Sequence, residues 1–278
     1  MITERRGNGF ECEIARVLDE CRRRTRLRFA LGLTVVALLA AALAGSGGFQ
    51  LDRYAGASRI FLQLLADSFP PDFSRVGNWV RPLLETIAMS VAATLLGAAA
   101  AVPLALLAAR NTGFPSAVSA TARLLLNGAR SIPELVFGII FVAAVGFGAL
   151  AGVLALTCHS VGLLGKFATE HFEHLDRGPA EALQSHGVSR AGIIRFCLLP
   201  QVLPRLVDVT LYRWEHNVRA ASVMGMIGAG GLGLELVTAF SLFEYREATA
   251  LLIILFAVVT VIDGLSSRLR RSFLDFSG

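Results

Sequence analysis

Residues 131–165 read SIPELVFGIIFVAAVGFGALAGVLALTCHSVGLLG, and this stretch decides the class of fold. Its single acidic residue is Glu134, and it contains no lysine or arginine. A helix that crosses a bilayer needs about 20 mostly apolar residues, so the stretch is too long for one crossing. The glycines of Gly146-Phe147-Gly148 are typical of a turn. The stretch therefore predicts two spans, at about 131–146 and 148–164.

Four further apolar runs lie on either side of this pair, at about residues 29–44, 83–109, 202–227 and 248–265. Over all 278 residues, 54% are hydrophobic and 17% are charged, and the mean hydropathy is +0.62. Soluble domains carry about 25% charged residues, and disordered chains combine high charge with low hydrophobicity. The composition therefore excludes an ordinary cytosolic enzyme and a disordered chain. It predicts an all-α, polytopic membrane protein with six transmembrane helices.

The basic residues indicate how these spans are oriented. Nineteen of the 26 fall on the two termini and on the connections near residues 110–130 and 165–205, which all lie on one side of a six-span arrangement. The opposite side has five. Because cytoplasmic loops are enriched in arginine and lysine, both termini are predicted to be cytoplasmic. Nucleic-acid binding is not expected, because no basic face remains once the spans are placed.

Residues 1–28 are expected to form a separate cytoplasmic segment ahead of a transmembrane domain at 29–278. Ile14, Val17, Leu18 and Cys21 recur at helical spacing, with arginines on both sides. This pattern is typical of an amphipathic helix that lies on a membrane surface, the lipid bilayer being its partner.

The connection between the fourth and fifth spans, residues 176–200, reads DRGPAEALQSHGVSRAGIIRFCLLP. Pro179 and Glu181 suit the first turn of a helix. Gly187 can adopt the left-handed conformation that ends a helix, and Ser189 can cap a second helix. The second helix is expected to end near Pro200. The stretch predicts a short helix, a tight turn and another short helix.

The first of these helices carries more apolar surface than a solvated connector needs. Ala180, Ala182, Leu183 and Val188 supply that surface. A helix of this kind can dock in a groove of a partner protein. A solvated connector is the alternative, and a DNA-reading helix is not expected so close to a bilayer.

The fifth span is unusually polar, with residues 211–225 reading LYRWEHNVRAASVMG. Ionisable residues inside a membrane usually face a cavity or one another. Glu215 and Arg219 are spaced i, i+4 and are expected to pair, which leaves Arg213 free to attract an anion. We therefore interpret Arg213, Glu215, Asn217 and Arg219 as a pathway for an anionic substrate, because guanidinium groups suit oxyanions. A structural ion pair between helices is the alternative.

A run of glycines follows this span. Gly228, Gly230, Gly231 and Gly233 permit a tight turn and close helix approach, and we interpret them as part of a gate. A dinucleotide-binding loop would need a preceding strand, which the sequence does not predict.

The sequence predicts neither a catalytic nor a metal site, nor a bound cofactor. A phosphate-binding P-loop requires the pattern GxxxxGK[ST]. The single lysine, Lys166, follows glycines at the wrong spacing and precedes a phenylalanine. His171 and His174 lack a clear third metal ligand. The chain therefore cannot hydrolyse ATP by this mechanism on its own.

The connection at 176–200 resembles the EAA loop of bacterial ABC importer permeases. Glu181, Ala182, Gly187, Leu199 and Pro200 stand at the spacing of the pattern EAAx3Gx9IxLP. The sequence departs from the pattern at Leu183 and Cys197, and both replacements are apolar. The resemblance implies that Glu181, Ala182, Leu183, Gly187, Leu199 and Pro200 couple the chain to the ATPase.

Three further motifs are similar to phosphonate-type permeases within this methionine-importer-like family. They are Phe69-Pro-Pro-Asp-Phe73, Arg130-Ser-Ile-Pro-Glu134, and Glu215-x-Asn217-x-Arg219 with the glycine run after it. The resemblance implies a type I permease in a bacterial inner membrane, which forms a homodimer. It also implies two copies of an ATPase, a periplasmic phosphonate-binding protein, and phosphonate, phosphate or phosphite as substrate. A self-sufficient secondary transporter and a membrane enzyme are the competing classes.

Overall fold

A computed structural model describes the backbone of residues 4–46, 56–176 and 178–275, and the side chains of 22–46, 56–176 and 178–272. Within these ranges all regular structure is helical, which confirms the predicted all-α fold class. The chain divides into two units, Met1–Leu65 and Ala66–Gly278.

The first unit consists mainly of one long helix, α1, Glu4–Gly45. The predicted surface segment and the first predicted span therefore belong to one continuous helix. Side chains 22–46 of this unit are all exposed. The amphipathic pattern of Ile14, Val17, Leu18 and Cys21 lies outside the described side chains. Helix α3, Ala57–Ser68, follows and runs into the second unit.

The second unit is a bundle of helices that contains every predicted site residue. Its long helices are α4, Val76–Ala108; α7, Ala149–Glu173; α10, Leu199–Gly225; and α12, Tyr245–Asp275. Shorter elements connect them: η1, Arg110–Thr112; α5, Ser116–Ser131; α6, Glu134–Val145; α8, Gly178–Ser185; α9, Arg190–Ile193; a π-helical turn η2, Ile194–Leu198; and α11, Leu232–Ser241.

Four described helices are long and apolar enough to cross a membrane: part of α1, then α4, α7 and α12. The bent pair α5–α6 makes a fifth when it is taken as one span. Helix α10 has 27 residues and is long enough, but its polar residues exclude it from this group. Five of the six predicted spans thus pass this test when the bent pair counts as one, and the predicted fifth span, α10, does not.

The third span differs most from the prediction. Residues 116–131 were expected to lie in a connection, but they form α5, and the chain bends by 90° before α6. Ile132 has extended backbone angles at the bend, as a residue before a proline prefers, and Pro133 follows it. Helix α6 alone has 12 residues, too few for a full crossing.

Small residues bring α4, α7 and α10 close together at the centre of the bundle. The core here consists of Met89, Ala93, Ala155, Leu156, Ala220, Ala221, Met224 and Ala229. A Cβ atom on Gly97 would lie 2.7 Å from the Cβ of Ser160, so glycine is required for this approach. Close packing of this kind is typical of helices in membranes, where small residues let backbones meet.

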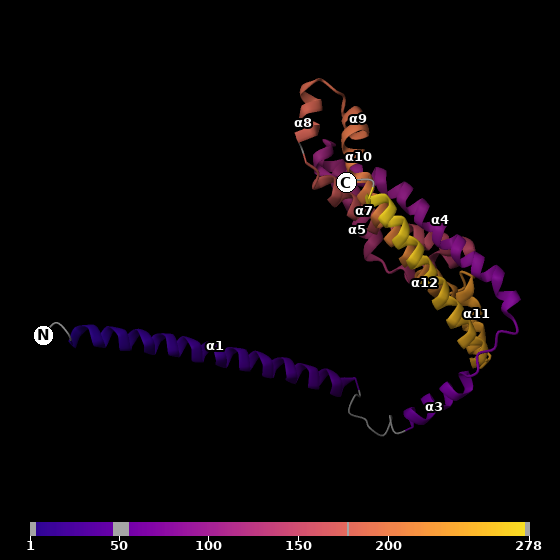
Figure 1. Cartoon of the computed structure of the whole chain (residues 1–278), viewed down its shortest axis with the longest axis horizontal. Helices are drawn as coiled ribbons and strands as arrows, with labels where there is room; N and C mark the ends of the chain where they lie inside the picture. The colour runs from indigo at the N-terminus through magenta and orange to yellow at the C-terminus, as the bar shows by residue number, and fades with distance from the viewer. Residues whose placement is uncertain (1–3, 47–55, 177, 276–278) are drawn as a thin grey trace. The chain divides into compact units, whose positions relative to one another are not determined.

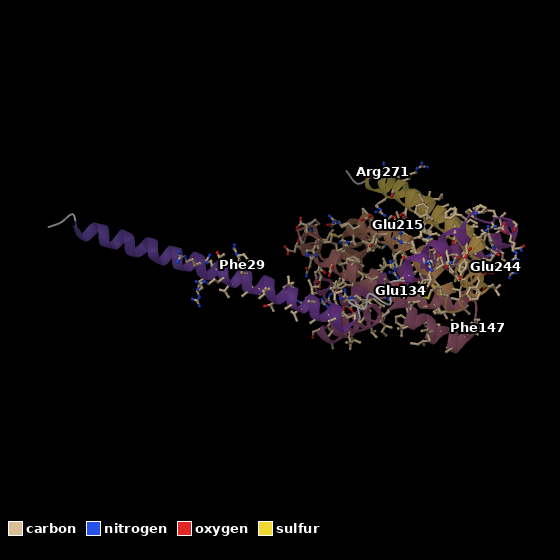
Figure 2. All side chains as sticks on the ribbon, turned by 90° about the horizontal axis from the view of Figure 1, so that it is seen from below. Phe29, Glu134, Phe147, Glu215, Glu244 and Arg271 are labelled. Carbon is tan, nitrogen blue, oxygen red and sulfur yellow. The ribbon has the colours of Figure 1, made fainter. Side chains whose placement is uncertain are left out.

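The two ends of the second unit differ in structure (Figure 1). Helices α8 and α9 project together at one end, which we call the loop end, whereas α11 lies at the other, the opposite end. Helix α12 runs between the two ends. Figure 2 shows Glu134 and Glu215 in the middle part of this unit, and Glu244 and Phe147 toward the opposite end.

Candidate functional site: a buried arginine and its surroundings

The side chain of Arg213 lies at the centre of the bundle and is only 3% exposed. Its Nε–H donates a hydrogen bond to Ser160 Oγ on α7 at 2.9 Å. Asn217, one turn later on α10, is completely buried and donates through Nδ2 to Ser160 Oγ at 3.1 Å and to Thr94 Oγ1 on α4 at 2.8 Å. Ser160 therefore fixes the arginine, and Asn217 links Ser160 to Thr94 of α4.

A carboxylate faces this arginine from α6. Glu134 Oε2 lies 3.8 Å from Arg213 Nη2, which is too long for a hydrogen bond. Glu134 is held instead by His216 Nε2, at 3.2 and 3.3 Å from its two oxygens, and approached by His159 Nε2 at 3.4 Å. We call Arg213, Glu134, His159 and His216 the central cluster.

The Nη2 group of Arg213 is buried and makes no hydrogen bond within the described residues. A buried donor without an acceptor is costly, and the cost is larger for a charged group. Such an orphaned group calls for an explanation. The geometry of the central cluster therefore leaves the Nη2 group of the guanidinium available to an additional acceptor.

The structure contradicts the expected pair between Glu215 and Arg219. Glu215 forms an ion pair with Arg270 of α12, and Arg219 forms one with Asp263 of α12 at 3.3 Å. Glu215 and Arg219 thus contact α12, whereas Arg213 and Asn217 contact α4 and α7. The side chain of Arg219 is 47% exposed, unlike that of Arg213. Of the four predicted pathway residues, only Arg213 and Asn217 belong to the buried network.

The glycine run after α10 forms a tight turn into α11. Gly228, Gly230 and Gly231 have φ angles of 95°, 81° and 73°, which favour glycine. A Cβ on Gly233 would lie 1.7 Å from the backbone oxygen of Ser222, so α10 and α11 could not pack this way with a larger residue. The predicted tight turn and close approach are confirmed. The role as a gate stays a prediction.

This glycine turn is attached to two neighbouring helices. Gly148 N–H donates to Gly228 O at 3.0 Å, at the start of α7. Leu232 N–H donates to Thr86 Oγ1 of α4 at 2.9 Å. Movement of α4 or α7 would therefore be transmitted directly to the turn.

At the loop end, α8 ends as the sequence predicts. Gly187 has a φ of 76°, its N–H donates to Gln184 O at 3.0 Å, and Val188 N–H donates to Leu183 O at 3.2 Å. This pair of bonds closes a helix in the Schellman manner. Ser189 Oγ then accepts from Gly192 N–H at 3.4 Å and caps α9.

The predicted end of the second helix near Pro200 is wrong. The chain continues from α9 through the π-helical turn η2 into α10, with Leu199 N–H bonded to Ile194 O. Pro200 lies in the first turn of α10, where the missing N–H of proline costs little. The loop is therefore joined to the polar span by unbroken helix.

Some apolar residues of α8 and η2 pack against the bundle, and others are exposed. Ala180 and Leu183 pack against a core cluster of α4, α7 and η2 that includes Phe172 and Leu198. Ala182, Pro179 and Phe196 are exposed, and Phe196 is 72% exposed. They line an open hollow of about 630 Å³, together with Leu183, His186, Cys197, Pro200 and Gln201. Glu181 is exposed and lines a second cavity of about 380 Å³ between α8 and the bundle.

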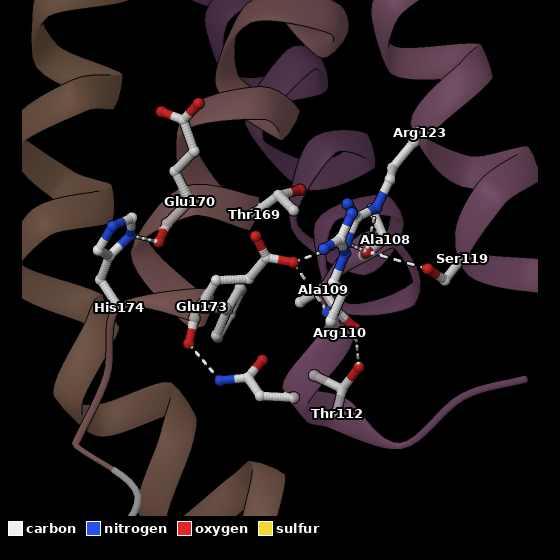
Figure 3. Close-up of polar contacts among 12 residues, drawn as sticks. Ala108, Ala109, Arg110, Thr112, Ser119, Arg123, Thr169, Glu170, Glu173 and His174 are labelled. Atoms are coloured by element: carbon white, nitrogen blue, oxygen red, sulfur yellow. Dashed lines mark hydrogen bonds and ion pairs between the residues drawn. The ribbon is translucent and has the colours of Figure 1, made fainter. Parts of the chain in front are cut away.

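A second arginine–glutamate pair joins α4, α5 and α7 just beneath the loop end (Figure 3). Arg123 of α5 donates to Ala108 O through Nε at 2.9 Å and through Nη2 at 2.7 Å, and its Nη2 lies 2.6 Å from Glu173 Oε1. Glu173 also accepts from Arg110 N–H at 2.9 Å. Nearby, Arg190 of α9 donates to Gly113 O at 2.9 Å. We call Arg123, Glu173 and Ala108 the loop-end joint.

The opposite end carries a charged cavity of about 420 Å³. Arg75 pairs with Glu244 at 3.2 Å and with Glu247 at 2.9 Å beside it. Asp72 also lines it, and the hydrogen bond that Asp72 Oδ1 accepts from Ser74 N–H at 2.8 Å lowers the pKa of this carboxyl. In the described part of the chain, three or more His, Cys, Asp and Glu side chains nowhere gather as they would to hold a metal ion.

A comparison with known protein families shows which family this chain belongs to. Residues 101–274 match the family of binding-protein-dependent transport system inner membrane components, and the chain belongs to that family. It is a multi-pass permease of a bacterial inner-membrane ABC importer, and thus a transport subunit rather than an enzyme. Permeases of this kind work with an ATPase and a substrate-binding protein.

Several relatives share much of the sequence. The phosphite transport system permease protein PtxC of Stutzerimonas stutzeri is 49% identical over 210 residues, which cover 76% of each chain. A putative phosphite transport system permease protein of the same organism, HtxC, is 39% identical over 265 residues, or 95% of this chain and 93% of that one. The phosphate-import permease protein PhnE of Mycolicibacterium smegmatis is 39% identical over 215 residues, but only 40% of its length is covered.

Solved structures of importers share the fold. The MetNI methionine ABC transporter in an inward-facing conformation aligns with a TM-score of 0.62 at 24% identity, over 70% of this chain and 95% of that one. A bacterial ABC transporter for the import of alginate aligns with a TM-score of 0.61 at 15% identity, over 84% of this chain and 95% of that one. At these identities the likeness shows the type I permease fold alone.

Proposed function

We propose that this permease transports phosphorus oxyanions of the phosphonate class, and that the anion passes Arg213. The observation that carries the proposal is the free Nη2 group of Arg213, buried at the centre of the bundle and fixed by Ser160. An arginine fixed at one edge presents its other N–H groups in a planar fork, which suits the oxygens of a phosphonate, phosphate or phosphite.

Phosphite is the second candidate within this class. PtxC and HtxC are both named as phosphite permeases, and both are at least 39% identical to this chain. Phosphite and alkylphosphonates present the same tetrahedral set of phosphorus-bound oxygens to an arginine. The central cluster therefore suits both, and the choice between them rests on the binding protein that delivers the substrate.

The loop at 176–200 is proposed to couple this pathway to the ATPase. Glu181, Ala182 and Gly187 are exposed at the loop end, and Leu199 and Pro200 begin α10 without a helical break. The open hollow beside Ala182, Leu183 and Pro200 offers apolar surface for a partner. A push on α8 would reach Arg213 along η2 and α10.

The remaining assembly follows from these assignments. With both termini in the cytoplasm, the loop end faces the ATPase and the opposite end faces a periplasmic phosphonate-binding protein. The cavity beside Arg75 and Asp72 lies where that protein would dock. We further propose a homodimer with two ATPase copies, in which Gly228, Gly230, Gly231 and Gly233 act as a gate.

Uptake by the reconstituted importer tests the pathway. We expect Arg213→Gln to reduce uptake of phosphite and methylphosphonate about a hundredfold, because the buried fork that binds the oxyanion is lost. The matched variant is Arg219→Gln, on the same helix but paired with Asp263 at the surface. Uptake that survives in Arg213→Gln, or that is lost equally in both variants, would remove the special role of Arg213.

A further inference from the structure

We propose that Glu134 is an internal counter-anion for Arg213, which an entering oxyanion must displace. Glu134 would thereby select anions over neutral and cationic solutes. The inference rests on the proposed function, in that it takes Arg213 as the group that meets the substrate, and it adds a residue from another helix and a selection step.

The exposure of the side chains shows from which side an anion reaches Arg213. Arg213 is 3% exposed, and Ser160, Asn217 and Thr94, which lie behind it, are buried. The side chain of Glu134 is 25% exposed and that of His216 is 38% exposed. The open side of the central cluster is thus the side of Glu134. A solute that approaches Arg213 therefore first meets this carboxylate.

The charge balance gives the reason for displacement. A buried arginine without a counter-ion has a large desolvation penalty. Among the described residues, Glu134 carries the one carboxylate within 4 Å of Arg213. An oxyanion can replace this carboxylate and keep the arginine neutralised. A neutral or cationic solute cannot, so the Glu134 carboxylate stays and excludes it.

The hydrogen bonds around Glu134 make this exchange feasible. At 3.8 Å from Nη2, Glu134 neutralises the charge of Arg213 without accepting from its N–H. The carboxylate is held by His216, whose Nε2–H must donate because a carboxylate only accepts. Displacement therefore breaks no hydrogen bond to Arg213, but only the ion pair and the hydrogen bonds from His216. The free N–H and His216 then both become donors to the oxyanion.

Binding measurements on the purified complex of the permease with its ATPase test the proposal. The probe is radiolabelled phosphite, without binding protein. Glu134→Gln removes the competing charge but keeps the shape of the side chain. We expect the Kd for phosphite to fall about tenfold, or about 1.4 kcal/mol. The control is Asp263→Asn, a carboxylate on α12 paired with Arg219, which should leave the Kd unchanged.

Glu134→Asp provides a second variant in case Glu134→Gln fails to assemble. It keeps the charge but withdraws it from Arg213 by one methylene, so the Kd should fall by a smaller factor. A Kd that is unchanged or higher in the assembled Glu134 variants overturns the counter-anion role. Arg213→Gln separates this result from the proposed function. Loss of binding in that variant upholds Arg213 as the anion site, and normal binding removes it.

Discussion

The loop-end joint and the central cluster are both built on an arginine and a glutamate, but their hydrogen bonding differs. Arg123 lies 2.6 Å from Glu173 and also donates to Ala108 O. Arg213 lies 3.8 Å from Glu134 and has a buried N–H without an acceptor. The joint is a completed structural contact among three helices. The central cluster is an incomplete one, and this difference supports our proposal that the substrate anion binds there.

The comparison shows that burial alone does not separate structural from functional charges. Arg213 is more buried than Arg123, whose side chain is 28% exposed. A buried donor without an acceptor is what distinguishes Arg213 from Arg123. The bonds that Arg123 makes stabilise the fold, whereas the orphaned Nη2 group of Arg213 is a cost that calls for an explanation. Variants at the two arginines should therefore change different quantities.

The largest expected effect is on stability, at the joint. Arg123→Lys keeps the charge but loses the planar fork that reaches Ala108 O and Glu173 together. We expect the free energy of unfolding to fall by about 2 kcal/mol. Thermal denaturation of the purified permease measures this change. Uptake per folded molecule should be retained, and unchanged stability would show that the joint is dispensable.

Next in size is the effect of the same substitution at the central cluster. Arg213→Lys should weaken phosphite binding about tenfold, or about 1.4 kcal/mol, because an ammonium cannot hold Ser160 and an oxyanion in one plane. Stability should change by less than at Arg123, since the orphaned N–H is removed. A drop in stability with normal binding would make the two arginines equivalent and end the distinction.

A smaller effect is expected above the joint, at Gly187. Its φ of 76° disfavours any residue with a Cβ, so Gly187→Ala should destabilise the turn by about 1 kcal/mol. Gly128→Ala in α5 is the matched variant, because a Cβ there meets open space and alanine favours helix. Co-purification with the ATPase should weaken only for Gly187→Ala. Equal attachment of both variants would argue against the coupling role.

The smallest effect is predicted for the exposed pair of α10 and α12. Asp263→Asn breaks the ion pair with Arg219. The side chain of Asp263 is 43% exposed and that of Arg219 is 47% exposed. Where water reaches them, half-exposed pairs contribute at most about 1 kcal/mol and often nothing. Stability and uptake should both stay within experimental error of the unaltered protein. A strong uptake defect would restore Arg219 to the pathway.

The sequence predicted correctly those features that depend only on residues close together in the chain. Gly187 and Ser189 predicted the end of α8 and the cap of α9, because these conformations depend on a few neighbouring residues. The polar fifth span was predicted for the same reason. Its i, i+4 pairing was wrong because Arg270 and Asp263, distant in sequence, lie closer in the bundle to Glu215 and Arg219.

The parts that depend on distant contacts could not be predicted. Glu134, His159 and His216 meet from three helices. The sequence singles out Glu134 as the lone acidic residue of its apolar stretch, but it does not show that Glu134 meets these two histidines. The segment that forms α5 was predicted to be a connection because it carries arginines. In the fold, Arg123 donates a hydrogen bond to Ala108 O and pairs with Glu173. The contacts that form the central cluster were therefore found only in the structure.

The most direct test is an experimental structure of the permease–ATPase complex loaded with phosphite. The account predicts an oxyanion within about 3 Å of Arg213 Nη2, with Ser160 still bound to Nε and the carboxylate of Glu134 farther away than 3.8 Å. A loaded complex in which Arg213 meets no anion, while Glu134 keeps its present place beside His216, would contradict it.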